Sequence, residues 1–249
     1  MKDIIDKYRN SQKRLLLLDY DGTLVPFSSI PINSVPSEEL LNILEKLDNN
    51  KYTTVIIISG RSNDDLDKLL GKLSVKMIAE HGAVIKSSSG WHNVIDESFI
   101  WKKSVISILD EITRACSGSY IEEKRFSLNW DYRYSNSELG SLKSREIIYR
   151  LEDDGLLQLY DLKIHAGSKN VEILPRKIGK GQAVLEIIRQ NRYDFILSIG
   201  DETTDEEMFE VLMDNLDAYT IKVGEGDTFA KYKFKDVSEV VLLLKTLSL

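Results

Sequence analysis

The sequence predicts an α/β fold with a parallel β-sheet core, interrupted by a smaller inserted α+β domain. Apolar strand-like runs alternate with helix-like segments in the first third of the chain and again in the last third, as in a parallel sheet. In the middle third, two strand-like runs follow each of two helix-like segments, which favours an α+β domain. The core strands are apolar at consecutive positions, which is typical of a sheet covered on both faces.

The first third contains three strand-like runs separated by helical patterns. These strands are predicted at residues 15–18, 52–59 and 75–79. The first intervening helix follows Ser37, whose hydroxyl is a good N-cap, and it carries leucines at helical spacing. The second intervening helix begins at Ser62 or Asn63. A serine-rich run ending at Gly90 then predicts a hairpin turn.

The insert is predicted to have an α-β-β-α-β-β order. Its elements are a helix around residues 105–112, strands at 119–126 and 127–133, a helix at 138–151, and strands at 156–166 and 171–174. Pro175 marks the return to the core, because proline is disfavoured inside a strand. We therefore predict a core of residues 1–97 and 176–249 and an insert of residues 98–175.

The last third returns to alternation and completes the parallel sheet. Its predicted elements are a helix at residues 179–190, a strand at 194–199, a helix at 204–212, a strand at 218–223 and a terminal amphipathic helix.

Composition limits the classes of function. The chain has 249 residues, of which 42% are hydrophobic, and a formal net charge of -7, so we expect a globular protein that does not bind nucleic acid. The single cysteine, Cys116, excludes an intrachain disulfide, and no signal-peptide pattern is recognised, which favours the cytoplasm. No apolar run approaches the roughly 20 residues of a membrane span. We expect a monomer, because no long exposed apolar stripe is evident.

Two carboxylates follow the first predicted strand. Asp19 and Asp21 are two residues apart, so both can lean to the same side as the chain turns at Gly22. One can attack phosphorus while the other transfers protons, which indicates phosphoryl transfer. An ordinary polar turn is the alternative. A calcium loop is excluded, because Gly22 comes too early and Thr23 stands where such a loop needs an oxygen-rich acidic or amide ligand.

Further polar groups follow other core strands, where open α/β sheets bind ligands. Ser59 follows the second strand, and its hydroxyl suits a phosphoryl oxygen. Asp201 follows a strand of the last third and is followed by Glu202 and Asp205, which suit Mg²⁺. Lys180 lies at a helix start, where a lysine is unfavourable unless it faces an anion. We expect the remaining acids, Glu206 and Glu207, to cap the helix after Asp201.

The chain resembles the haloacid dehalogenase (HAD) superfamily of phosphohydrolases in its four motifs, which fall here at D-Y-D-G-T (19–23), Ser59, Lys180 and Gly200-Asp201 with Asp205. Longer strings resemble the trehalose-6-phosphate phosphatase family: L-D-Y-D-G-T-L at 18–24, S-G-R at 59–61, E-H-G-A at 80–83, G-K-G at 179–181 and G-D-E-T-T-D-E at 200–206. The insert resembles the family at E-E-K (122–124), Y-R (132–133) and N-V-E-I (170–173). The resemblance implies a Rossmann-like HAD core with a cap domain of the C2B type.

The resemblance also implies residue roles. Asp19 is expected to be the nucleophile and Asp21 the acid and base, with Ser59 and Lys180 orienting the phosphoryl group and Arg61 assisting. Mg²⁺ is expected on Asp19, the Asp21 backbone carbonyl and Asp201, with Glu202 or Asp205 behind these ligands. The expected sugar-binding residues lie in the cap: Glu122, Lys124, Arg133, Asn170 and Glu172.

Three departures affect these expectations. Glu202, Asp131 and Ser168 stand where the family often has Asp, His and Lys, and Lys169 follows one place after Ser168. The alternatives are a phosphatase for another sugar phosphate, such as sucrose phosphate or mannosyl-3-phosphoglycerate, and a non-catalytic HAD-like regulatory module. The expected partners are a small sugar phosphate and a trehalose-phosphate synthase.

Overall fold

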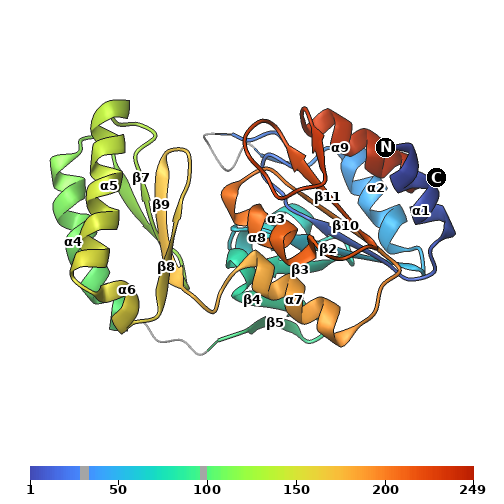
Figure 1. Ribbon diagram of the computed structural model, residues 1–249, viewed down its shortest axis with the longest axis horizontal. Helices are drawn as coiled ribbons and strands as arrows, with labels where there is room; N and C mark the ends of the chain where they lie inside the picture. The colour runs from blue at the N-terminus through green and yellow to red at the C-terminus, as the bar shows by residue number, and fades with distance from the viewer. Residues whose placement is uncertain (29–33, 96–99) are drawn as a thin grey trace. The chain divides into compact units, whose positions relative to one another are not determined.

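The computed structural model describes residues 1–28, 34–95 and 100–249, and the chain divides into two compact units (Figure 1). The core unit comprises Met1–Val94 and Gly179–Leu249, and the insert comprises Ile95–Ile178. The predicted boundary at residues 97–98 lies outside the described residues. The predicted return to the core after Pro175 falls just before the observed return at Gly179.

Within the described residues, the core unit forms an eight-stranded sheet in the order β12-β11-β10-β1-β2-β3-β4-β5. The strands are β1 (Arg14–Leu18), β2 (Thr53–Ile58), β3 (Lys76–Ala79), β4 (Val84–Ser87), β5 (Gly90–Asn93), β10 (Phe195–Gly200), β11 (Ala218–Val223) and β12 (Tyr232–Phe234). Strands β12 to β3 pair in parallel, and β4 and β5 add an antiparallel hairpin at the edge. The predicted parallel sheet and hairpin are confirmed.

Helices cover both faces of this sheet. They are α1 (Lys2–Asn10), α2 (Glu38–Asp48), α3 (Asn63–Leu70), α7 (Lys180–Gln190), α8 (Thr203–Leu212) and α9 (Val237–Leu247), with a 3₁₀ turn, η2 (Glu80–Gly82), after β3. Figure 1 shows α2 and α9 on one side of the sheet and α7 and α8 on the other. Every residue of β1 is buried, which accounts for the four consecutive leucines after Arg14.

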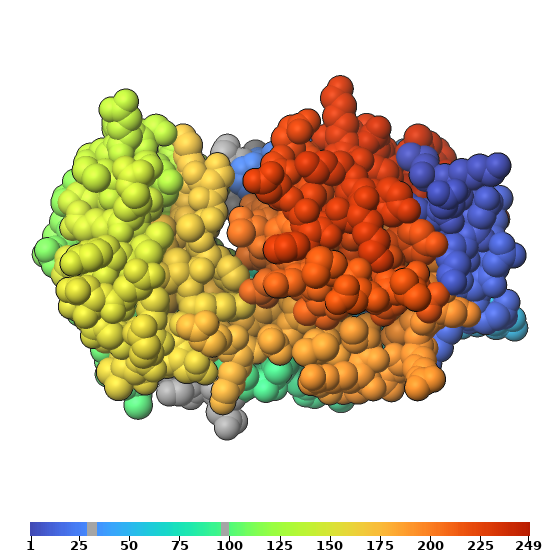
Figure 2. Space-filling view, in the orientation of Figure 1, coloured from blue at the N-terminus to red at the C-terminus, as the bar shows by residue number. Residues whose placement is uncertain are grey.

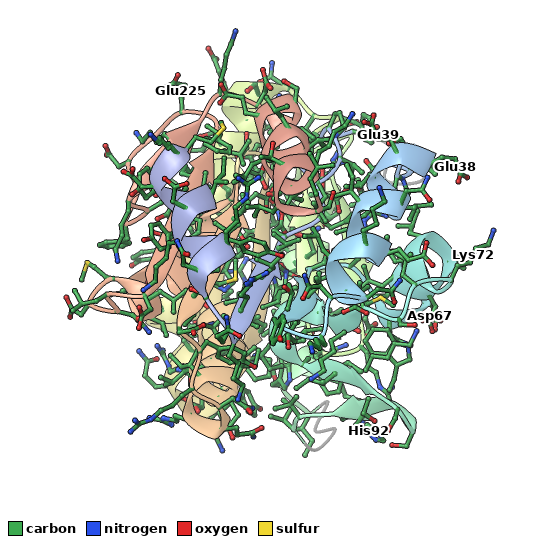
Figure 3. The ribbon with its side chains drawn as sticks, turned by 90° about the vertical axis from the view of Figure 1, so that its right-hand side faces the viewer. Glu38, Glu39, Asp67, Lys72, His92 and Glu225 are labelled. Atoms are coloured by element: carbon green, nitrogen blue, oxygen red, sulfur yellow. The ribbon has the colours of Figure 1, made fainter. Side chains whose placement is uncertain are left out.

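Helices α2 and α3 begin where the sequence predicts. Ser37 accepts a hydrogen bond from the Leu40 amide, and Ser62 accepts one from the Asp65 amide, so each serine caps a helix. Figure 3 shows Glu38 and Glu39, in the first turn of α2, pointing away from the ribbon. Acidic side chains at this end of a helix are favourable because they face the positive end of the helix dipole.

The insert has its own antiparallel sheet, in the order β6-β7-β9-β8. Its elements are α4 (Ile100–Ala115), β6 (Tyr120–Glu123), β7 (Leu128–Asp131), α5 (Ser137–Asp153), α6 (Leu156–Leu159), β8 (Leu162–Ala166) and β9 (Asn170–Pro175). Leu128, Trp130 and Ile173 pack in one apolar core with residues of α4 and α5. Figure 2 shows one face of the surface of this unit, coloured green to yellow. The predicted α-β-β-α-β-β order is confirmed, with one short helix added.

Some elements differ from the sequence prediction. Residues 156–166 were expected to form one strand, but Leu156–Leu159 is helical and only Leu162–Ala166 pairs in the sheet. A short apolar run has no clear period, so pairing partners decide its conformation. Helix α1 and strand β12 are additions that the sequence analysis did not predict. No helix among the described residues is long and apolar enough to cross a membrane.

Candidate active site

The site is built at the carboxyl ends of three adjacent parallel strands. Strand β1 lies between β10 and β2, and Leu18 lies opposite Ile199 on one side and Ile57 on the other. The loops that leave these strands therefore meet at one edge of the sheet. They carry Asp19 and Asp21 from β1, Ser59 from β2 and Asp201 from β10.

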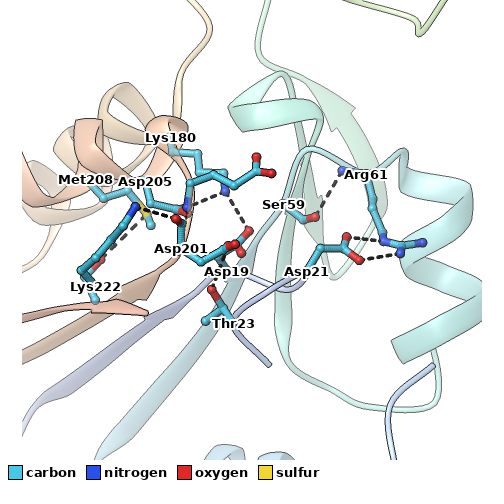
Figure 4. A network of polar contacts seen from close by, with 12 residues as sticks. Asp19, Asp21, Thr23, Ser59, Arg61, Lys180, Asp201, Asp205, Met208 and Lys222 are labelled. Atoms are coloured by element: carbon cyan, nitrogen blue, oxygen red, sulfur yellow. Dashed lines mark hydrogen bonds and ion pairs between the residues drawn. The ribbon is translucent and has the colours of Figure 1, made fainter. Parts of the chain in front are cut away.

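Lys180 connects two carboxylates at the centre of the site (Figure 4). Its ammonium group donates to Asp19 Oδ1 at 2.7 Å and to Asp205 Oδ1 at 2.8 Å. All three side chains are almost fully buried, since their exposed fractions are 3%, 6% and 0%. A lysine at the first residue of α7 opposes the helix dipole, and these two carboxylates compensate for that position.

The second oxygen of Asp205 is also occupied. Asp205 Oδ2 accepts from the backbone amides of Asp201 and Glu202, each at 2.9 Å, and so caps α8. The sequence analysis assigned this cap to Glu206 and Glu207, which was wrong. Glu206 instead accepts from the backbone amide of Phe229 and from Thr228. Glu202 is the N-cap residue of α8 and is exposed.

Two glycines make room for the acidic side chains. A Cβ on Gly22 would lie 2.0 Å from Asp201 Oδ2, and Gly22 has a φ of +77°, a conformation that other residues rarely adopt. A Cβ on Gly200 would lie 2.2 Å from Cγ of Asp205. Glycine at position 22 thus permits the close approach of the β1 and β10 loops, and glycine at position 200 leaves room for the Asp205 side chain.

Burial and mutual repulsion change the acidity of the site. Burial, followed by the nearby Asp205, raises the pKa of Asp19 to about 7, although Lys180 opposes this shift. Burial, followed by Asp19 and Asp205, raises the pKa of Asp201 to about 9. Burial opposes the charged form of Lys180, but Asp19 and Asp205 together raise its pKa above the usual value. One lysine therefore does not neutralise the carboxylates gathered here.

This donor set fits a divalent cation. Asp19, Asp201 and Asp205 each offer an oxygen, and these oxygens lie within 4.8 Å of one another. Magnesium prefers carboxylate oxygens and retains several waters, so few protein ligands suffice. Both oxygens of Asp205 already accept hydrogen bonds, so Asp19 and Asp201 are the better metal ligands. Asp205 instead fixes the Lys180 ammonium group and the Asp201 backbone amide beside these ligands.

Asp21 lies beside this cluster and pairs with Arg61. Arg61 donates from Nε to Asp21 Oδ2 at 2.6 Å and from Nη2 to Asp21 Oδ1 at 2.7 Å (Figure 4). This two-point contact occupies both oxygens of the carboxylate. The Ser59 hydroxyl accepts from the Arg61 backbone amide at 3.2 Å. The structure thus brings Asp21, Ser59 and Arg61 together, but it places the Arg61 guanidinium on Asp21.

The turn η2 supports the loop that carries Ser59 and Arg61. The Glu80 amide donates to the Arg61 carbonyl, and the His81 amide donates to the Ser59 carbonyl. Both Glu80 and His81 have positive φ, at 44° and 56°, and both are buried. Such backbone strain persists only where the surrounding contacts impose it. His81 thus shapes the turn that follows β3.

The predicted residues of the insert lie on one face of its sheet. Glu172, only 4% exposed, accepts from Lys124 at 3.1 Å and from the Ser127 hydroxyl at 2.6 Å. Glu122 and Asn170 are joined through Asn129, whose amide donates to Glu122 and whose carbonyl oxygen accepts from Asn170. The structure brings these four predicted residues into a row of cross-strand contacts.

Arg133 and three further polar residues complete this face. Arg133 donates from Nε to the buried Asp131 at 2.8 Å. The sequence analysis did not select Ser127 or Asn129 and treated Asp131 only as a departure from the family. The alternation in β7 contained the signal, because Leu128 and Trp130 are core residues while Asn129 and Asp131 fall on the opposite face.

Comparison with known proteins agrees with this arrangement. The family profile described as "Trehalose-phosphatase" matches residues 17–238. The chain is 35% identical over its whole length to "Alpha,alpha-trehalose-phosphate synthase [UDP-forming] B" of Dictyostelium discoideum. It is 36% identical over 96% of its length to the "Bifunctional trehalose-6-phosphate synthase/phosphatase" of Thermoproteus tenax. The chain spans 32% of the length of each of these relatives.

A solved structure is similar throughout. The C-terminal domain of Candida albicans trehalose-6-phosphate phosphatase superposes with a TM-score of 0.90 at 31% identity, covering 99% of this chain and 96% of that one. The fold, the acidic cluster with its lysine, and the extent of the profile match lead to one conclusion. This chain belongs to the trehalose-phosphatase family.

Proposed function

We propose that the protein is a Mg²⁺-dependent phosphatase that hydrolyses trehalose 6-phosphate to trehalose and phosphate. The observation that carries this proposal is the buried cluster of Asp19, Lys180, Asp201 and Asp205. A nucleophile, a cation that faces it and a set of oxygen ligands meet there, as phosphoryl transfer requires. Membership of the family supports the substrate.

The proposed reaction has two displacements at phosphorus. In the first, a carboxylate oxygen of Asp19 forms a bond to phosphorus as the bond to the sugar oxygen breaks, and Asp21 gives a proton to that oxygen. In the second, water attacks phosphorus and Asp21 takes its proton. Phosphate leaves, and the Asp19 carboxylate is restored. Lys180, 2.7 Å from Asp19, and the Ser59 hydroxyl orient the phosphoryl oxygens.

Magnesium would be held by Asp19, the Asp21 carbonyl and Asp201, with Asp205 fixing the Asp201 backbone. When bound, it would neutralise charge on the transferring group. Glu202 is exposed at the N-cap of α8, which makes it a weaker candidate for supporting the ligands than Asp205.

We propose that Arg61 controls when Asp21 can transfer a proton. Because both oxygens of Asp21 accept from Arg61, one of them has to be released before this carboxyl delivers a proton. An incoming phosphate, a stronger partner for a guanidinium, provides a reason for that release. In this proposal, Arg61 contacts the substrate phosphate after its exchange with Asp21.

We propose that the insert is a cap domain whose side chains recognise the sugar. Glu122, Lys124, Arg133, Asn170 and Glu172 supply charged and amide groups on one sheet face, and a disaccharide requires many donors and acceptors. Asn129 joins this set because it bridges Glu122 and Asn170.

The decisive experiment measures phosphate release from trehalose 6-phosphate with and without Mg²⁺. We expect activity only with the metal, and we expect Asp19→Asn to abolish it by removing the nucleophile. Equal activity of Asp19→Asn and the unmodified protein refutes the mechanism. No release from any phosphate ester by a folded, Mg²⁺-loaded protein identifies the non-catalytic regulatory module instead.

Substrate choice requires a separate measurement. We expect kcat/KM for trehalose 6-phosphate to exceed that for sucrose phosphate and mannosyl-3-phosphoglycerate, because the insert reads both rings. Similar values across mono- and disaccharide phosphates contradict the trehalose assignment.

We also propose that the protein is a cytoplasmic monomer and that it associates with a trehalose-phosphate synthase. Two relatives whose names include a synthase are about three times the length of this chain, which covers 32% of each, and this supports the association. Sedimentation of the protein alone and with such a synthase tests both statements.

A further inference from the structure

Lys222 is a buried lysine that the proposed reaction does not use. It lies near the carboxyl end of β11, next to β10 in the sheet, and is 6% exposed. A charged group in the interior is costly unless polar partners replace its water. Its contacts therefore indicate what holds it there.

The ammonium group of Lys222 has two partners. It donates to the backbone carbonyl of Asp201 at 2.5 Å and lies 3.4 Å from Glu206 Oε1 (Figure 4 shows the contact with Asp201). The other oxygen of Glu206 accepts from Thr228 at 3.0 Å and from the Phe229 amide at 2.9 Å. Glu206 thus ties Lys222 to the loop that follows β11.

Charged side chains hold the backbone of Asp201 on both sides. Asp205 accepts from its amide at 2.9 Å, and Lys222 donates to its carbonyl. The Asp201 carboxylate contacts Thr23 at 3.4 Å and lies so close to Gly22 that no side chain fits there. A rotation of the peptide that follows Asp201 would alter where this carboxylate lies, because the direction of a side chain follows its backbone.

We propose that Lys222 is a positioning residue that sets the Mg²⁺ affinity of the site by fixing the Asp201 carbonyl. This inference rests on the proposed function, since it assumes that Asp201 binds the metal. Partners that orient metal ligands typically change metal affinity by about 10- to 100-fold when they are removed. Lys222 acts on the orientation of the carboxylate and does not touch the substrate.

The test is a titration of the 249-residue chain with Mg²⁺. Calorimetry and the thermal shift report binding, and both readouts are independent of turnover. We expect Lys222→Met to raise the Kd for Mg²⁺ at least about tenfold. Lys222→Arg, which keeps the charge and the donor, should restore most of the affinity. The control is Lys233→Met, because Lys233 is the register partner of Lys222, also donates to a backbone carbonyl, and is exposed. Its Kd should be unchanged.

A further variant separates positioning from general stability. Glu206→Gln weakens the contacts with the Thr228 hydroxyl and the Phe229 amide but does not remove the hydrogen bond from Lys222 to the Asp201 carbonyl. We expect it to lower the melting temperature with little change in Kd. If Lys222→Met does not fold, Lys222→Gln, which is too short to reach the carbonyl, replaces it.

The outcomes are distinct. An unchanged Kd in folded Lys222→Met or Lys222→Gln overturns the inference and leaves the proposed function intact. A Kd raised equally by Glu206→Gln also overturns it, because the loop would then be the cause. If the unmodified protein does not bind Mg²⁺, the proposed metal site fails together with this inference.

Discussion

At the residue scale, the site depends on which groups each charged side chain meets. Asp19 and Asp205 share Lys180, and Asp21 is paired with Arg61, so two carboxylates from one strand end have different partners. Different environments separate the behaviour of chemically identical groups, as the proposed roles of a nucleophile and of an acid and base require. The two cationic side chains, Lys180 and Arg61, are therefore not interchangeable.

Substitution of Arg61 distinguishes two roles. If Arg61 governs Asp21, Arg61→Gln should lower kcat for trehalose 6-phosphate by about 10²-fold, the lower end of the usual acid–base contribution. The loss on p-nitrophenyl phosphate should be smaller, because its leaving group departs without a proton. Rates on both substrates provide the measurement. Equal losses would mean that Arg61 only binds the phosphate, as its sequence motif suggested.

Substitution of Gly22 tests the tight approach to Asp201. Gly22→Ala should destabilise the protein by about 1–3 kcal/mol and weaken Mg²⁺ binding, because the new Cβ collides with the Asp201 carboxylate and φ is unfavourable. The control is Gly155→Ala, where φ is a similar +68° but no atom lies within 4 Å. That variant should lose stability and keep its Mg²⁺ affinity. A matching loss of affinity in both variants would show that strain alone is responsible.

At the element scale, the antiparallel sheet of the insert separates its two faces by alternation. Leu128 and Trp130 enter its core, while Asn129 joins the polar row on the other face. Strand β7 thus contributes one face to the apolar core and the other to the polar row. The predicted strand positions were sufficient to place the sugar-reading candidates on one face, but not to show how they contact one another.

Removal of Asn129 tests that face. Asn129→Ala should raise KM for trehalose 6-phosphate about tenfold, because Glu122 and Asn170 lose their bridge and their orientation. Activity on p-nitrophenyl phosphate should stay near its original value. Glu138→Gln, a change of an exposed residue at the start of α5, is the control and should alter neither rate. If Asn129→Ala slows both substrates equally, the residue supports the insert without reading the sugar.

At the scale of the whole molecule, buried acids link stability to pH and metal. The folded-state pKa values of Asp19 and Asp201, about 7 and about 9, lie above their ordinary value of 3.8. Between pH 3.8 and about pH 9, the folded state therefore binds more protons than the unfolded chain. The free energy of unfolding falls as the pH rises through this range. A bound cation should offset that loss, because it binds the ionised carboxylates.

The expected result is a Mg²⁺-induced rise in melting temperature that is larger at about pH 8.5 than at about pH 5.5. Thermal unfolding with Mg²⁺ and with a chelator measures it at each pH. Asp201→Asn, which removes one titrating ligand, should flatten both dependences. A Mg²⁺ effect of the same size at both pH values would contradict the shared buried site.

The sequence by itself determined the parallel core, the helix starts at Ser37 and Ser62, and the residues that gather at the site. These follow from period, cap chemistry and motifs, which are local properties of the chain. Only the tertiary structure decided that Arg61 pairs with Asp21, that Asp205 caps α8, and that Lys222 holds the Asp201 carbonyl. Those contacts depend on backbone approach and side-chain direction across neighbouring loops and strands, which no local pattern encodes. In the sequence, Lys222 is an ordinary polar residue of a predicted strand. The pairing of β11 with β10 brings its ammonium group to the Asp201 carbonyl.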